Sequence, residues 1–202
     1  MSHYYDVNPE VKSNQKKISY HFDKVHLEFT TDTGVFSKDR VDYGWELLIK
    51  TFLKVHPPGP SKYIDDVGCG YGPIGLTIAK VSPHHQLYML DVNNRALVLT
   101  EMNKTKNQIE NAEIIESDCL SGVSDQQFDY ILTNPPIRAG KDVVHRIFEE
   151  AYGKLKDQGA LYVVIQKKQG MPSAKKKMQE CFNHVEVVNK SKGYYILKSL
   201  KG

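Results

Sequence analysis

The feature of this chain that most constrains its fold is the alternation of strand-like and helix-like segments from residue 62 onward. Runs such as YILT and LYVVI are apolar throughout, which is typical of strands buried on both faces of a parallel sheet. Alternation on this scale predicts a doubly wound α/β sheet. We expect strands at residues 63–67, 86–90, 113–116, 128–133, 160–166, 185–189 and 194–199, and helices at 73–81, 94–107, 141–154 and 173–182.

The last two expected strands pair differently from the others. Only SKG separates VEVVNK from YYILKSL, and so short a link permits only antiparallel pairing. A parallel sheet that ends in an antiparallel hairpin is not the arrangement of an ordinary dinucleotide-binding fold.

A hairpin and a helix are expected ahead of this sheet. Residues 18–22 and 25–30 alternate in polarity and meet at Asp23-Lys24, as the strands of a hairpin do. Ser37 or Asp39 can cap a helix that runs up to the prolines of HPPGP, where it must end.

Length and composition fit one domain over residues 1–202, made of an N-terminal extension (1–60) and a core (61–202). No apolar stretch is long enough to span a membrane and no secretion signal is present, so we expect a cytoplasmic monomer with no membrane partner. The cysteines and histidines match no zinc-binding spacing, so no metal is expected. The net charge of +3 permits an RNA partner without requiring one.

The strongest local signal is DVGCGYGPIG, residues 66–75, in which an apolar strand runs into alternating glycines and then a helix. Glycine permits positive φ and lets a ligand approach the backbone without a Cβ in the way. The alternative is a tight turn that binds nothing. Gly70, Gly72 and Gly75 also satisfy the dinucleotide pattern, so an NAD enzyme has to be considered.

Acidic residues at strand ends narrow the choice of ligand. Asp91 ends the second core strand, where it can hold the ribose hydroxyls of either cofactor. Asp66, directly before the glycines, would repel a pyrophosphate but can pair with the ammonium of an amino-acid tail, which S-adenosylmethionine has and NAD lacks. Asp118 can accept a hydrogen bond from an adenine amino group with Cys119 beside the ring, or can be a simple turn residue.

The segment most specific for function is TNPPIRAGK, after the fourth core strand. Pro135 and Pro136 stiffen the chain, and Asn134 is biased to an extended conformation. The Asn134 amide oxygen and the Pro135 carbonyl can then hold both hydrogens of an NH2 group. Two such acceptors favour a pyramidal nitrogen whose lone pair faces a sulfonium methyl, so positioning and electrostatics supply most of the catalysis. A stiff loop without function is the alternative.

These motifs resemble the class I S-adenosylmethionine-dependent methyltransferases that modify amino nitrogens. More narrowly, GVFSKDRVDYG, DVGCGYGPIG and TNPPIRAGK look like segments of the small-subunit (16S) ribosomal RNA guanine-N2 methyltransferases, over residues 20–200. The resemblance implies S-adenosylmethionine as the cofactor. It also implies an α/β, Rossmann-like single-domain fold with a seven-stranded, mostly parallel sheet and a C-terminal antiparallel hairpin, behind the N-terminal hairpin and helix.

The resemblance also assigns site residues. Asn134, Pro135 and Pro136 surround the target amine as the catalytic group. The cofactor-binding residues are Asp66, Gly68, Cys69, Gly70, Gly72, Asp91, Val92, Asp118, Cys119, Asn134 and Phe36, the last from a segment that folds over the methionine end.

The chain departs from the family pattern in two ways. Larger relatives carry a further N-terminal domain, so the chain resembles their catalytic half alone. Ile137 and Arg138 stand where many amino-methylating enzymes have an aromatic that stacks on the base, and Arg138 can stack or hold a phosphate instead. The substrate-binding residues that we expect are Arg138, Lys141, Lys167 and Lys168, with Arg146 also on this basic rim.

We therefore predict methyl transfer to guanine N2 in small-subunit ribosomal RNA, with the RNA or the subunit as partner. Two alternatives are a methyltransferase acting on a protein glutamine or a small molecule, and a nucleoside-binding ribosome-assembly factor without catalysis.

Overall fold

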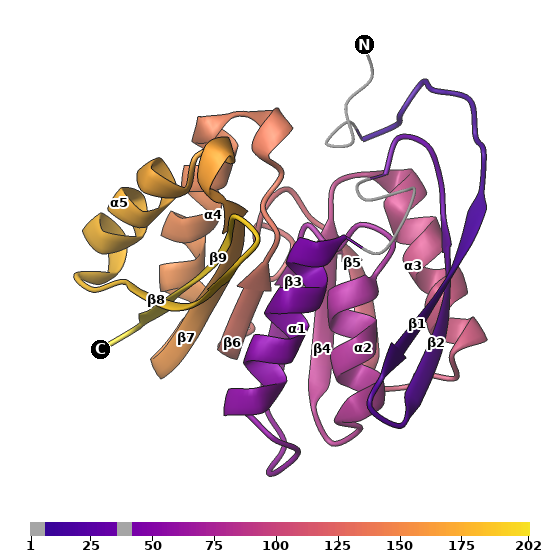
Figure 1. Cartoon of the computed structure of the whole chain (residues 1–202), viewed down its shortest axis with the longest axis horizontal. Helices are drawn as coiled ribbons and strands as arrows, with labels where there is room; N and C mark the ends of the chain where they lie inside the picture. Colours follow the sequence, from indigo (N-terminus) through magenta and orange to yellow (C-terminus); the bar gives the residue numbers. More distant parts are fainter. Residues whose placement is uncertain (1–6, 36–41) are drawn as a thin grey trace.

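The computed structural model of the protein describes residues 7–35 and 42–202. A seven-stranded sheet runs through its centre in the order β5-β4-β3-β6-β7-β9-β8 (Figure 1). The neighbouring strands β5, β4, β3, β6 and β7 run parallel to one another, whereas β9 is antiparallel to both β7 and β8. The predicted mostly parallel sheet with a C-terminal antiparallel hairpin is confirmed. The strands are β3 (Tyr63–Val67), β4 (Gln86–Asp91), β5 (Ala112–Glu116), β6 (Phe128–Thr133), β7 (Leu155–Gln166), β8 (Glu186–Ser191) and β9 (Tyr194–Leu200).

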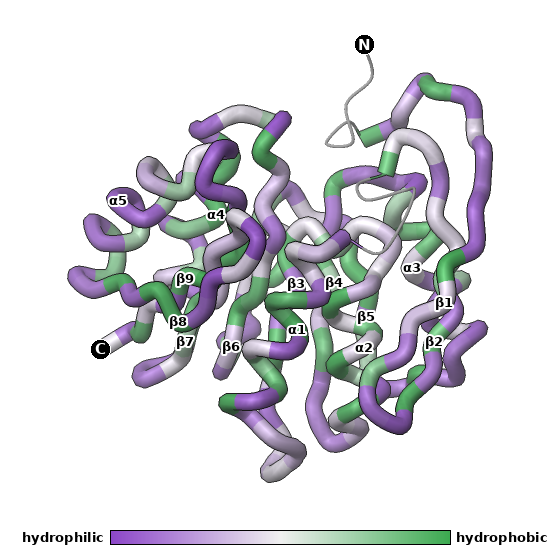
Figure 2. The backbone as a smooth tube through the Cα atoms, in the orientation of Figure 1, coloured by the Kyte–Doolittle hydropathy of each residue, from purple (hydrophilic) through white to green (hydrophobic). Residues whose placement is uncertain are grey.

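Helices cover both faces of the sheet, and each face has its own hydrophobic core. Successive side chains of a strand point to opposite faces, so Tyr162 and Val164 of β7 join one core while Leu161 and Val163 join the other. Hydrophobic residues gather along the central strands, whereas the outer hairpin and the loops are largely hydrophilic (Figure 2). The first face carries α1 (Tyr43–Val55), α2 (Pro73–Val81) and α3 (Asn94–Lys106), and the second carries α4 (Lys141–Lys154) and α5 (Met171–Phe182).

The predicted N-terminal hairpin is a separate two-stranded sheet of β1 (Lys16–Phe22) and β2 (Val25–Thr31). Its β2 edge is docked on α3 by two asparagine side chains. The Asn103 amide bonds to both the N–H and the C=O of Thr30, at 2.7 and 2.9 Å. The Asn107 amide does the same for Glu28, at 2.9 and 2.8 Å. These four hydrogen bonds satisfy a strand edge that would otherwise be unpaired.

The start of α1 differs from the expectation. The helix begins at Tyr43, and its N-cap is Asp42, whose Oδ1 accepts a hydrogen bond from the Gly44 N–H at 2.6 Å. The prediction of Ser37 or Asp39 as the cap is wrong, because the residue at the N-cap position, directly before Tyr43, is Asp42. Both residues lie outside the described ranges.

Several element boundaries also differ by a few residues. β7 starts at Leu155, because Leu155 pairs with Phe128 of β6, and Gln158 and Gly159 then pair with the Lys201 backbone at 2.7 and 2.9 Å. β8 extends to Ser191, so the turn to β9 has two residues, Lys192 and Gly193, both with positive φ as a tight hairpin requires. Short 3-10 turns, Ile137–Ala139 (η1) and Lys167–Gln169 (η2), follow β6 and β7.

The described residues also bear on two expected classes of partner, membranes and metal ions. None of the helices formed by residues 7–35 and 42–202 is long and apolar enough to cross a membrane. The same part of the chain holds no group of three or more histidine, cysteine, aspartate or glutamate side chains arranged to bind a metal ion. The division into a 1–60 extension and a 61–202 core stays a prediction.

Candidate active site

The glycine loop between β3 and α2 is pinned to the end of the neighbouring strand. The N–H groups of Gly68 and Cys69 both donate to the Leu90 carbonyl, at 2.8 and 2.9 Å. Gly68, Gly70 and Gly72 all have positive φ, of 70°, 61° and 98°. These angles explain why the sequence uses glycine at alternate positions here.

The three glycines serve different purposes. A Cβ added to Gly68 would meet nothing within 4 Å, and one added to Gly70 would meet only Val35, at 3.9 Å. A Cβ on Gly72 would lie 2.7 Å from Leu76 Cδ1. Gly68 and Gly70 therefore border open space that a ligand can fill, whereas Gly72 allows α2 to pack against the loop.

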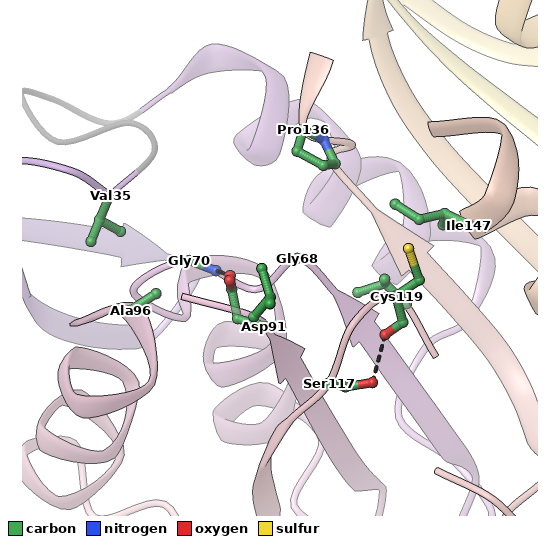
Figure 3. Close-up of a pocket in the computed structure, with 11 residues that line it drawn as sticks. Val35, Gly68, Gly70, Asp91, Ala96, Ser117, Cys119, Pro136 and Ile147 are labelled. Carbon is green, nitrogen blue, oxygen red and sulfur yellow. Dashed lines mark hydrogen bonds between the residues drawn. The ribbon is translucent and has the colours of Figure 1, made fainter. Parts of the chain in front are cut away.

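That open space is a cavity of about 490 Å³, counting its mouth, at the carboxyl ends of the parallel strands. Val35 and Ala96 lie at one end, Cys119 and Ile147 at the other, and Gly68, Gly70 and Asp91 between them (Figure 3). The complete lining is Val35, Val67, Gly68, Gly70, Asp91, Val92, Ala96, Ser117, Cys119, Pro136 and Ile147.

Asp91 presents its carboxylate to this cavity from the end of β4. Its Oδ2 accepts a hydrogen bond from the Gly70 N–H at 2.8 Å, and its Oδ1 accepts one from the Asn93 N–H at 2.9 Å. Burial raises the pKa of Asp91 to about 6, although these backbone hydrogen bonds act against the rise. Each oxygen keeps acceptor capacity, so the carboxylate can bind a pair of hydroxyl groups.

Asp66 lies beneath the glycine loop and is not part of the cavity wall. Its Oδ2 accepts a hydrogen bond from the Gly75 N–H at 2.9 Å, which ties β3 to the first turn of α2. Its Oδ1 is buried and has no hydrogen-bond partner within residues 7–35 and 42–202. Burial raises the pKa of Asp66 to about 7. Contact between Asp66 and the ammonium of a ligand stays a prediction.

The segment after β5 is held by an arginine of α4. Arg146 bonds to the Asp118 carboxylate, and its Nε and one terminal nitrogen lie 3.2 and 3.1 Å from Cys119 Sγ. Cys119 lines the cavity, and its carbonyl accepts a hydrogen bond from Ser117 Oγ at 2.8 Å (Figure 3). Asp118 is half exposed beside the cavity and does not line it. Arg146 therefore holds Asp118 and Cys119 in place beside the cavity, in addition to its expected place on the basic rim.

The Asn134-Pro135-Pro136 turn lies against the same cavity, because Pro136 is part of its wall (Figure 3). Thr133 Oγ1 donates to the Val67 carbonyl at 2.9 Å and so fixes the end of β6 to the end of β3. Asn134 is half-buried, and its side-chain amide has no hydrogen-bond partner among the described residues. The Pro135 carbonyl accepts a hydrogen bond from the Ile137 N–H at 2.9 Å, which leaves one lone pair for a ligand.

The other predicted site residues have different surroundings. Cys69 is buried, with its thiol 3.8 Å from the Thr100 hydroxyl, so it supports the glycine loop without lining the cavity. Phe36 lies outside the described residues. The four cationic residues expected to bind substrate, Arg138, Lys141, Lys167 and Lys168, are exposed on segments that follow β6 and β7.

Five lining residues were missed by sequence reasoning: Val35, Val67, Ala96, Ser117 and Ile147. Val67 and Ser117 directly precede predicted site residues, so adjacency was a usable signal. Val35 belongs to a motif that the resemblance already covers. Ala96 and Ile147 come from helices, and no pattern in the chain tells which helical residue will face a cavity.

Comparison with known proteins identifies the family. The family described as "Methyltransferase small domain" matches residues 26–198. The chain belongs to this family. It is 51% identical to the uncharacterized protein YbxB of Bacillus subtilis over 200 residues, covering 98% of each chain. It is 30% identical to the ribosomal RNA small subunit methyltransferase C of Vibrio vulnificus over 179 residues, covering 87% of this chain and 50% of that protein.

A solved structure confirms the class I methyltransferase fold. The 16S rRNA N2 G1207 methyltransferase of T. thermophilus, in complex with AdoMet and guanosine, superposes with a TM-score of 0.84 at 22% identity. The alignment covers 96% of this chain and 52% of that one. The chain thus spans about half the length of both ribosomal RNA methyltransferases but nearly all of YbxB.

S-adenosylmethionine is the cofactor of this methyltransferase family, and the cavity fits it. Gly68 and Gly70 border the cavity with no Cβ to obstruct a ligand. Asp91 offers acceptors for ribose hydroxyls, and the unpartnered Oδ1 of Asp66 is a buried acceptor beneath the same loop. Apolar groups at both ends suit the ring and aliphatic parts of the ligand.

Proposed function

We propose that this methyltransferase transfers a methyl group from S-adenosylmethionine to N2 of guanine in small-subunit ribosomal RNA. The observation that carries the proposal is that the Asn134-Pro135-Pro136 turn and the Gly68–Gly70 loop border one cavity, since Pro136, Gly68 and Gly70 all line it. An amine held at the turn is then next to a cofactor held at the loop.

The chain's own residues bind and orient the two reactants. Gly68, Gly70 and Asp91 would hold the cofactor, with Asp91 accepting hydrogen bonds from its ribose. Cys119 would contact the adenine, Asp118, held by Arg146 beside the cavity, would accept from its amino group, and Asp66 would supply negative charge near the amino-acid tail. When bound, the cofactor supplies a methyl group on a positively charged sulfur.

The target amine is held by two acceptors on the Asn134-Pro135-Pro136 turn, whose backbone is stiffened by the two prolines. The Asn134 side-chain oxygen and the remaining lone pair of the Pro135 carbonyl each accept one hydrogen of the NH2 group. This directs the nitrogen lone pair at the methyl group, so that the reaction gains chiefly from positioning. The nitrogen becomes positively charged as the bond forms and releases its proton afterwards, so the site needs no strong general base.

A cationic rim beside the turn fits an RNA substrate. Arg138 and Lys141 follow β6, and Lys167 and Lys168 follow the neighbouring strand β7, about 5 Å away in the sheet. The β8–β9 turn joins them, because the Lys167 N–H donates to the Gly193 carbonyl at 2.9 Å. Exposed ammonium and guanidinium groups of this kind bind phosphates. By contrast, Lys177 pairs with Glu149 and contributes less.

Lys192 in the β8–β9 turn adds a fifth cation to this rim. Its ammonium lies over the Tyr43 ring, 4.5 Å from the centroid, a cation–π contact that holds the side chain in place on the rim. The similar proteins of Vibrio vulnificus and T. thermophilus are named as ribosomal RNA methyltransferases, which supports ribosomal RNA as the substrate class. We further propose that the protein acts as a cytoplasmic monomer.

The test is methyl transfer from tritiated S-adenosylmethionine to ribosomal RNA or small subunits from cells that lack the protein, followed by nucleoside analysis. We expect label in N2-methylguanosine of the small-subunit RNA. Label recovered in a protein glutamine, in a small molecule or in another nucleoside would overturn the proposed substrate. Binding of subunits without any transfer would favour the non-catalytic assembly factor.

The rim is tested separately with two paired variants. Lys167→Ala with Lys168→Ala should raise the KM for RNA by about tenfold and reduce its dependence on salt, because two phosphate contacts are lost. Lys175→Ala with Lys176→Ala, which removes the same charge from an exposed part of α5, should change KM by less than about twofold. Equal effects of the two pairs would mean that only net charge matters.

A further inference from the structure

Residues 7–14, here called the N-terminal strap, lie against the start of α3 and the Asp32–Gly34 loop. The Val7 carbonyl accepts a hydrogen bond from the Asn94 N–H at 2.8 Å, and the Asn8 and Asn94 side chains bond at 2.9 Å. At the other end of the strap, Ser13 Oγ and the Asn14 N–H both donate to the Asp32 carboxylate at 2.6 Å. The strap is therefore fixed at both ends.

Arg95 connects the strap to the loop through three backbone carbonyls. One terminal nitrogen donates to the Thr33 carbonyl at 2.7 Å, and the other donates to the carbonyls of Val11 and Pro9, at 2.8 and 3.3 Å. A guanidinium can serve several acceptors at once in a fixed geometry, which a lysine cannot do.

The Asp32–Gly34 loop packs closely against the strap. Gly34 has a φ of 78°, and a Cβ added there would lie 2.9 Å from side-chain atoms of both Pro9 and Val11. A glycine is required at this position both for the backbone angle and for the contact with the strap. The next residue, Val35, is part of the cavity wall.

A buried asparagine links the same loop to the acidic residue of the site. Asn93 is fully buried, and its side-chain N–H donates to the Gly34 carbonyl at 2.9 Å while its Oδ1 caps the Ala96 N–H at 3.0 Å. Its backbone N–H donates to Asp91 Oδ1. The wall formed by Val35 and Ala96 and the carboxylate of Asp91 are thus held by one hydrogen-bond network.

From these contacts we infer that Arg95 is a positioning residue: with the N-terminal strap it sets the place of Gly34 and Val35, and cofactor affinity depends on it although it does not line the cavity. The inference rests on the proposed function only in taking the cavity to hold S-adenosylmethionine. It does not depend on which amine receives the methyl group.

The test compares Arg95→Ala, Arg95→Lys and Asp32→Ala with Glu101→Ala, a control on an exposed position of α3. Calorimetric Kd values for S-adenosylmethionine should rise by about tenfold in Arg95→Ala and Asp32→Ala, because the wall is no longer held in place. The Kd of Arg95→Lys should lie between the values of these two variants and that of the wild type, and the Kd of Glu101→Ala should match the wild type. Turnover at saturating cofactor should stay within about twofold of the wild type in Arg95→Ala, since the Asn134 turn is untouched.

Amide hydrogen exchange provides a readout that does not need the cofactor. Arg95→Ala should speed exchange at residues 33–35 in the free protein while leaving the sheet strands protected. Unchanged exchange there, or an unchanged Kd, would overturn the inference. A wild-type protein that bound no S-adenosylmethionine would instead contradict the proposed function, and the exchange result would still decide whether Arg95 holds the loop.

Discussion

Asn134 carries the proposed chemistry at the scale of a single side chain. Its amide is half-buried at the end of β6, with no partner among the described residues, directly before two prolines that fix the chain. Replacement by alanine removes one acceptor for the target amine without touching the glycine loop. We predict that Asn134→Ala lowers kcat by about 100-fold or more and changes the Kd for S-adenosylmethionine by less than about twofold.

Single-turnover kinetics and calorimetry on the same preparation measure these two quantities. Gln127→Ala, which removes an exposed amide far from the turn, is the matched control and should behave as the wild type. A variant at Asn134 that retains normal turnover would remove the role given to this side chain.

Asp91 makes cofactor binding dependent on pH. Its pKa is raised to about 6 in the free protein by burial, and ribose hydroxyls and a cationic ligand favour its ionised form. Binding therefore releases a proton, and affinity should rise as pH increases from about 5, with the contribution of Asp91 levelling off above about 7. Asp66, with a pKa raised to about 7 chiefly by burial, contributes in the same direction.

Calorimetric titrations across this pH range check the sign. Asp91→Asn should weaken binding and flatten the lower part of the curve, leaving the part that belongs to Asp66. An affinity that falls as pH rises would show that the carboxylates bind the ligand in their protonated form.

Sequence reasoning found Gly68, Gly70, Asp91, Cys119 and Pro136 because each follows a strand end, where a parallel sheet places its ligand. It did not find Arg146 as the partner of Asp118 and Cys119, since that contact joins α4 to the loop after β5. Such contacts depend on how two elements pack, which no local pattern encodes.

Within the glycine loop, two substitutions should have contrasting effects. Gly68→Ala adds a Cβ that points into open space, whereas Gly72→Ala adds one that lies 2.7 Å from Leu76 Cδ1. Both incur strain of about 1–2 kcal/mol at positive φ, but the second adds about 1–3 kcal/mol of overpacking. We predict that Gly68→Ala weakens cofactor binding about tenfold and lowers the Tm modestly. Gly72→Ala should lower the Tm by clearly more than Gly68→Ala does.

Thermal unfolding and calorimetry of the two variants provide the comparison. The expectation would be contradicted if Gly68→Ala bound the cofactor normally, because the Cβ would then not face the bound ligand.

Elements were predictable where one pattern dominated the sequence. The strands β6 and β7 contain the apolar runs YILT and LYVVI, and the short link between β8 and β9 required an antiparallel pair. After Leu155, which pairs with Phe128 of β6, the next residues of β7 are polar, so the run of apolar residues begins after the strand does. The N-terminal strap was not predicted at all, because its residues contact Asn94 and Arg95, which are 84 or 86 positions away in the sequence.

Asp65 affects the stability of the whole molecule. It is completely buried, and no side chain among the described residues hydrogen-bonds to its carboxylate, which has only the backbone of Asp66 to interact with. Burial, and then the charge of Asp66, raise its pKa well above the ordinary value of 3.8. The folded state therefore binds more protons than the unfolded state once pH exceeds about 4, and the free energy of unfolding falls as pH rises toward the folded pKa. Asp66 and Asp91 act in the same direction up to about pH 7 and 6.

We predict that Asp65→Val raises stability at pH 8 by about 1–3 kcal/mol, because it removes a buried group without side-chain partners among the described residues and suits a strand. It should also reduce the loss of stability between pH 5 and 8. Urea unfolding at both pH values measures this, with the exposed Asp125→Val as control. A less stable Asp65→Val protein would indicate that the carboxyl group has a bound partner such as an ordered water.

The most direct test of the central claim is an experimental structure with S-adenosylhomocysteine bound. A methyl group about 3–3.5 Å from the amine, and an amine about 3 Å from Asn134 Oδ1, together place the cofactor sulfur within about 8 Å of that oxygen. We predict this distance, with the sulfur above the Gly68–Gly70 loop. A sulfur more than about 10 Å from Asn134 Oδ1, too far for both groups to contact one amine, or an Asn134 side chain turned into the core, would contradict the claim.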